Sequence, residues 1–79
     1  MDFSNAGVTN SLGGGVYRAD VQWKDKGVNR HIRGPRRPDE DAAKDDLDFM
    51  RAAASGMSRE AGIAAMAAEA KRLYVRASR

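Results

Sequence analysis

The chain has 79 residues and no cysteine, so it has room for one small domain, and neither disulfides nor thiolate-bound zinc can hold its core. Apolar residues make up 42% of the chain, but 14 of them are alanine and five residues are aromatic, which predicts a thin core of small side chains. The net charge of +3 is unevenly distributed. Residues 16–38 carry seven basic residues against two acidic ones, and residues 39–48 carry six acidic residues against one lysine.

No apolar run reaches the roughly 18 residues that a membrane span needs, and the first 15 residues contain no hydrophobic signal segment. We therefore expect an intracellular protein without a membrane partner, located in the nucleus if it binds DNA in a eukaryote.

Residues 1–15 show little periodicity and end in three consecutive glycines, so we expect a flexible N-terminal segment followed by a single domain over residues 16–79. From Val16 the residues alternate between apolar and polar, as in a half-buried strand whose inner side carries Ala19, Val21 and Trp23. Residues 24–27 predict a turn in which Gly27 takes a positive φ and closes a short hairpin with a bulge.

A second strand is predicted over residues 28–33, where Arg30 shares the apolar side with Val28 and Ile32. Arg30 either extends outward at a sheet edge or is redirected by a bulge. Two strands alone are marginally stable. We therefore expect either a third strand near residues 7–12 or pairing with a second copy of the chain.

Pro38 suits the first turn of a helix that runs to about Ser55, with Gly56 as its stop. Ser58 then caps a second helix over residues 59–76. The expected apolar stripes are Ala43, Leu47, Met50 and Ala54 in the first helix, and Ile63, Met66, Ala67, Ala70, Leu73 and Tyr74 in the second. The predicted fold is α+β, with a small antiparallel sheet of two or three strands packed on two helices.

The polar sides of the two strands predict one outward basic face. Arginine suits phosphate and the guanine edge, asparagine and glutamine suit adenine, and a sheet can enter the major groove of DNA. The alternative is an ordinary solvated sheet face. Five of the seven basic residues are arginine and both amide side chains share their face, which favours nucleic acid, and we expect DNA rather than RNA. The candidate binding residues are Arg18, Gln22, Asn29, Arg30, His31, Arg33, Arg36 and Arg37.

No metal site, cofactor site or catalytic set is predicted. His31 is the one histidine, and without cysteine it has no partners for zinc nearby in the sequence. The acidic residues 39–48 lack the ligand spacing and central glycine of a calcium loop, and they suit the positive end of a helix dipole instead. We therefore expect a protein that is not an enzyme.

Residues 17 to about 56 resemble the plant ethylene-response-factor, or Apetala-type, DNA-binding domain. The stretch Tyr17-Arg18-Ala19-Asp20-Val21 resembles the family's "WVAEI" strand, Asn29 to Gly34 resembles its "RVWLG" strand, and Pro38 to Ala54 resembles its "TAEEAARAYDRAA" helix. The resemblance implies a three-stranded sheet on one helix, with Arg18, Asn29, His31 and Arg33 contacting DNA in the major groove. The chain departs from the family in lacking a clear "YRGVR" strand, in having His31 where the family prefers tryptophan, and in its second helix.

A second function class remains open from the sequence. The alanine-rich helix 59–76, or an open strand edge, suits a protein-binding or self-associating module without a nucleic-acid role. A homodimer formed through either surface would supply the apolar contacts that a thin core lacks.

Overall fold

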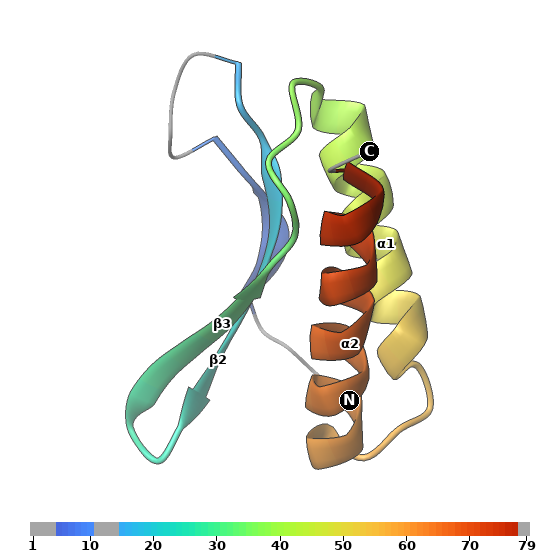
Figure 1. Ribbon diagram of the computed structural model, residues 1–79. Helices are drawn as coiled ribbons and strands as arrows, with labels where there is room; N and C mark the ends of the chain where they lie inside the picture. Colours follow the sequence, from blue (N-terminus) through green and yellow to red (C-terminus); the bar gives the residue numbers. More distant parts are fainter. Residues whose placement is uncertain (1–4, 11–14, 78–79) are drawn as a thin grey trace.

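The computed structural model describes residues 5–10 and 15–77, and it has a three-stranded antiparallel sheet covered on one side by two helices (Figure 1). The strand order is β1-β2-β3. The helix α1 packs against β1 and β2, while α2 packs against α1 and β3. This confirms the predicted α+β fold. The elements are β1 (Asn5–Thr9), β2 (Arg18–Asp25), β3 (Val28–Arg33), α1 (Glu40–Ala54) and α2 (Arg59–Ala77).

The β2–β3 hairpin closes through a two-residue turn. Lys26 and Gly27 have φ angles of 52° and 82°, the left-handed pair of a type I′ turn. Pairing is continuous from Asp25 opposite Val28 to Asp20 opposite Arg33, so the predicted bulge is absent. A type I′ turn already matches the twist of the strands and needs no extra residue. Figure 1 shows the turn end of this hairpin leading away from the helices.

The strand β1 pairs with β2 from Asn5 opposite Gln22 to Thr9 opposite Arg18. The third strand expected near residues 7–12 is therefore present, and it begins two residues earlier. This corrects the prediction of a flexible segment over residues 1–15, because residues 5–9 belong to the sheet and the domain starts before residue 16. The rest of that prediction falls partly on residues 1–4 and 11–14, which lie outside the described residues.

Both helices begin and end as the sequence predicts, to within two residues. The Asp41 N–H donates to the side chain of the N-cap Asp39 over 3.1 Å. The Ala61 N–H donates to Ser58 Oγ over 3.4 Å at the start of α2. Gly56 follows α1 with a φ of 74°, the left-handed conformation that glycine adopts at a helix end.

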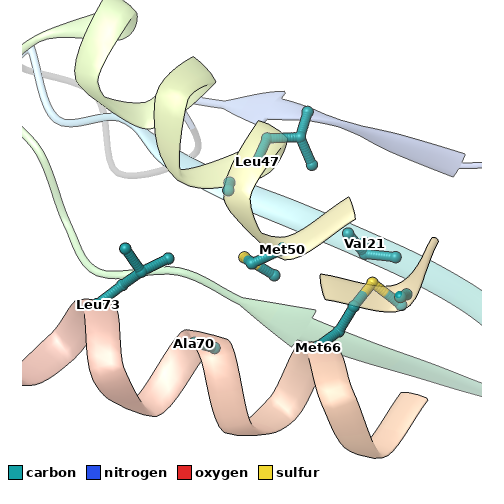
Figure 2. Packing of buried hydrophobic residues seen from close by; sticks show 8 residues of the cluster. Val21, Leu47, Met50, Met66, Ala70 and Leu73 are labelled. Carbon is teal, nitrogen blue, oxygen red and sulfur yellow. The ribbon is translucent and has the colours of Figure 1, made fainter. Parts of the chain in front are cut away.

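The core lies between the sheet and the two helices (Figure 2). Its largest fully buried side chains are Met50, Met66, Leu73 and Val21, so the thin core is confirmed. All four predicted positions of α1 are buried. In α2, Tyr74 and Ala67 are exposed, which corrects the predicted stripe. The buried row is instead Gly62, Met66, Ala70 and Leu73, since residues three or four apart along the helix point to the same side.

In the part of the chain that the structure describes, no helix has the length and apolar character needed to cross a membrane.

Candidate nucleic-acid interface

The side of the sheet that faces away from the helices is defined by the alternation of β2. Ala19 and Val21 are fully buried under the helices, so Gln22 and Lys24 point to the opposite side. The register places His31 opposite Gln22 and Asn29 opposite Lys24. All four of these residues are exposed, and so is Arg33 at the end of β3. We call these five residues the outer face: Gln22, Lys24, Asn29, His31 and Arg33.

The spacing of the outer face follows from strand geometry. Residues directly opposite each other on neighbouring strands have Cβ atoms about 5 Å apart. Residues two apart on one strand are separated by about 6.7 Å, roughly twice the 3.4 Å that separates successive phosphates of one DNA strand along the helix axis. Side chains of Gln22 and Lys24 on β2, like those of His31 and Asn29 on β3, are thus spaced by about two base steps.

Asp20 lies at the centre of the sheet, opposite Arg33 on one side and Gly7 on the other. It is 4% exposed. Its Oδ2 accepts a 2.9 Å hydrogen bond from Gln22 Nε2, and its Oδ1 lies 3.8 Å from Arg33 Nε. Oδ1 has no hydrogen-bond partner among the described residues. Asp20 therefore helps to position both Gln22 and Arg33.

Asp20 was not among the binding residues predicted from the sequence. Its place between Arg18 and Gln22 on the polar side of the strand was the signal that could have identified it. Residues two apart on a strand share a side, so the Asp20 carboxylate lies between Arg18 and Gln22. The neighbouring strand places Arg33 opposite it, which surrounds the carboxylate with cationic and amide side chains. Next to it, Gly7 carries no side chain, and a shallow depression lined by residues that include Gly7, Thr9, Asp20 and Gln22 lies over β1.

Arg18 belongs to the polar side of β2 by register, but its guanidinium contacts other elements. Its Nε donates to the carbonyl of Gly34 over 3.1 Å, and its Nη2 donates to the hydroxyl of Tyr74 in α2. Arg36 is exposed, and with Arg18 it lines a hollow at this end of the sheet. These two residues lie together, apart from the outer face.

Arg30 and Arg37 also lie elsewhere. Arg30 stands opposite Trp23, on the side of the sheet that faces the helices, and its Nε is 3.3 Å from Asp25 Oδ2. It therefore extends outward, as the first of the two sequence-based alternatives predicts. Arg37 binds Asp46 of α1 through two hydrogen bonds of 2.7 and 2.9 Å. Neither arginine belongs to the outer face.

The positive charge of the face is consequently lower than the sequence indicated. Of the seven basic residues within 16–38, Arg30, Arg33 and Arg37 form ion pairs with carboxylates. Within the described residues, Lys24, Lys26 and Arg36 have no such ion pair, nor does Arg18. The outer face thus carries two amides, one imidazole and two cations, of which Arg33 is paired with Asp20.

Within residues 5–10 and 15–77, no group of three or more histidine, aspartate or glutamate side chains is arranged to hold a metal ion. The acidic residues Asp41, Asp45 and Asp48 are exposed on α1. Asp46 is buried and pairs with Arg37, so it has a structural role, as has the N-cap Asp39.

Comparisons with protein-family models, curated proteins and solved structures found no match to this chain.

Proposed function

We propose that the protein binds nucleic acid, with duplex DNA as the preferred ligand, through the outer face of β2 and β3. The observation that supports this is the paired array in which Gln22 lies opposite His31 and Lys24 opposite Asn29. Each of these side chains is exposed and can donate a hydrogen bond, and Trp23 and Ile32 pack the strands beneath against the core. Strands that present such side chains can read the major groove.

The proposed roles follow from the chemistry of each side chain. Lys24 and Arg33 contact phosphates, since cations supply most of the affinity in such complexes. Gln22, Asn29 and His31 lie nearest the base edges, where an amide pairs with adenine through two hydrogen bonds. Asp20 holds Gln22 and Arg33 in place through the contacts described above. The helices serve as the scaffold.

The test is a fluorescence-anisotropy titration against labelled duplex DNA, single-stranded DNA and duplex RNA, at low and physiological salt. We expect duplex DNA to bind best, with log affinity falling against log salt by about 0.9 for each phosphate contacted. Lys24→Gln removes one phosphate contact without touching Asp20, and it should lower this slope by about one.

The matched control is Arg51→Gln, which removes an exposed charge from α1 on the other side of the sheet. If Arg51→Gln weakens binding as much as Lys24→Gln, the attraction is a property of net charge and the outer face is not the interface. Absence of binding to all three ligands at low salt would refute the proposed function.

Self-association or protein binding through α2 is the second candidate. The supporting observation is that α2 buries one row of residues and leaves alanines and Val75 exposed, the latter at 56%. Sedimentation equilibrium over a wide concentration range tests this candidate. A mass that rises with concentration, and that returns to the monomer value in Val75→Glu, would favour it.

A further inference from the structure

A hollow of about 430 Å³ lies at the end of the sheet opposite the β2–β3 turn. Three elements that are distant in the sequence form it: β2, the segment that follows β3, and the last turns of α2. Its lining residues are Arg18, Pro35, Arg36, Tyr74 and Ala77, and none of them is acidic. It shares no residue with the outer face.

Backbone hydrogen bonds fix the segment that carries Arg36. The Gly34 N–H donates to the Ala19 carbonyl over 2.9 Å, and Tyr17 and Arg37 exchange two hydrogen bonds of 2.7 Å. Pro35 and Arg36 are thus held between two anchored positions beside β2. The wall of the hollow is therefore defined by the fold rather than by a free loop.

Arg18 is held in the hollow by two partners. Its Nε donates to Gly34 and its Nη2 to the Tyr74 hydroxyl. A guanidinium has five N–H donors, and these two contacts leave others for a ligand. Among residues 5–10 and 15–77, neither Arg18 nor Arg36 forms an ion pair with a carboxylate.

We propose that this hollow binds a phosphate group, with Arg18 and Arg36 as its ligands and Tyr74 as the residue that positions Arg18. Two guanidinium groups that are not neutralised by carboxylates suit the tetrahedral oxygens of phosphate, which arginine binds through paired hydrogen bonds. The C-terminal end of α2 adds partial negative charge nearby. Because that partial charge opposes an anion, both arginines are needed to hold the phosphate, and we expect a millimolar affinity for inorganic phosphate.

This proposal does not depend on nucleic-acid binding at the outer face. The phosphate is either a terminal monoester or a phosphodiester of a nucleic-acid backbone, since both present anionic non-bridging oxygens to a guanidinium. A nucleic acid held on the outer face would add a contact here only if its backbone continues past Arg33 to this end of the sheet.

The test is a titration of the ¹⁵N-labelled protein with inorganic phosphate, followed by NMR of the arginine Nε–H signals. We expect saturable shifts for Arg18 and Arg36, and no saturable shift for Arg51. Arg36→Gln should weaken binding about tenfold, because it removes a charge-assisted bidentate contact. The control Arg76→Gln removes an exposed charge from the same end of α2 outside the hollow, and it should leave the affinity unchanged.

Tyr74→Phe tests the positioning role separately. It should move the Arg18 signal and weaken phosphate binding by a smaller factor than Arg36→Gln, with an unchanged melting temperature. Thymidine 5′-monophosphate and a thymidine dinucleotide with a single internal phosphodiester then distinguish the sources. Binding of the monophosphate alone assigns a terminal phosphate, and binding of both assigns a backbone phosphate.

The proposal is overturned if the shifts do not saturate, or if Arg36→Gln and Arg76→Gln weaken binding equally. The outer face gives an independent result: Lys24→Gln should leave the phosphate titration unchanged. Loss of nucleic-acid binding in that variant, with phosphate binding intact, separates the two sites.

Discussion

Arg37, in the segment that follows β3, donates hydrogen bonds of 2.7 and 2.9 Å from Nε and Nη2 to the two carboxylate oxygens of Asp46 in α1. The side chain of Asp46 is 3% exposed and that of Arg37 is 23% exposed. The hydrogen bond to Asp46 raises the pKa of Arg37 above its ordinary value, against the opposing effect of burial. This pair joins the end of the sheet to the first helix.

The first prediction concerns the asymmetry of this pair. Arg37→Ala leaves a deeply buried carboxylate without a cation, which should lower the free energy of unfolding by about 3 kcal/mol. Asp46→Ala leaves an arginine that can reach water, so we expect a loss of about 1 to 2 kcal/mol. Urea denaturation of both variants measures the difference. Equal losses would show that the burial of Asp46 does not control the energetics.

The pH dependence of the same pair has a definite sign. A group whose pKa is higher in the folded than in the unfolded state contributes stability below its unfolded pKa, and this is lost as pH rises through the folded pKa. For Arg37 that window lies far above neutral pH, because the ordinary pKa of arginine is already strongly alkaline and the fold raises it further. Titration of Arg37 should therefore add no slope to the stability of the protein at neutral pH, as urea midpoints across the neutral range would show.

The second prediction is a coupling between Asp20 and Arg33. Arg33→Gln should destabilise the fold by about 1 kcal/mol, because it removes the cation that faces a buried carboxylate. In the background of Asp20→Asn, which removes that negative charge, the same substitution should cost much less. A double-mutant cycle by urea denaturation measures the coupling. Additive effects would mean that the 3.8 Å contact carries no energy.

The third prediction concerns the turn between β2 and β3. Lys26 has a φ of 52°, a conformation in which asparagine is less strained than lysine. Lys26→Asn should stabilise the protein by about 0.5 kcal/mol, whereas Gly27→Ala, at a φ of 82°, should cost about 1 kcal/mol. Thermal melts followed by circular dichroism measure both. A loss of stability in Lys26→Asn would contradict the assignment of a type I′ turn.

The fourth prediction tests the methionine core. Met66 is fully buried in α2 between α1 and the sheet (Figure 2), so Met66→Ala should cost about 2 to 4 kcal/mol through the cavity that it leaves. Met66→Leu should cost less than about 1.5 kcal/mol, since it conserves the volume. Met57→Ala, at a position 42% exposed, is the control and should leave the melting temperature unchanged.

Local patterns in the sequence predicted the two helices, the β2–β3 hairpin and the buried row of α1. These elements follow from short-range signals: the alternation that ends at Trp23, the N-cap residues Asp39 and Ser58, and the positive φ of Gly27. Each signal acts within a few residues, so it can be read without knowing what packs against it.

The outer face was predicted in part for the same reason. Gln22, Asn29, His31 and Arg33 share one side of the sheet because strand alternation and the absence of a bulge set that side, and both are local properties. The first strand was harder to locate. Its five residues, Asn5–Thr9, have little alternation of their own, and they form a strand by pairing with β2.

Periodicity and composition are enough to predict the helices, the hairpin with its polar side and a core without large aromatic side chains. The partner of each arginine, in contrast, depends on how the elements pack. Arg37 was fixed by a carboxylate nine residues away on another element, and Arg18 by a tyrosine 56 residues away. A long, flexible cation takes whichever partner the packed elements bring within reach, and no pattern along the chain specifies that partner.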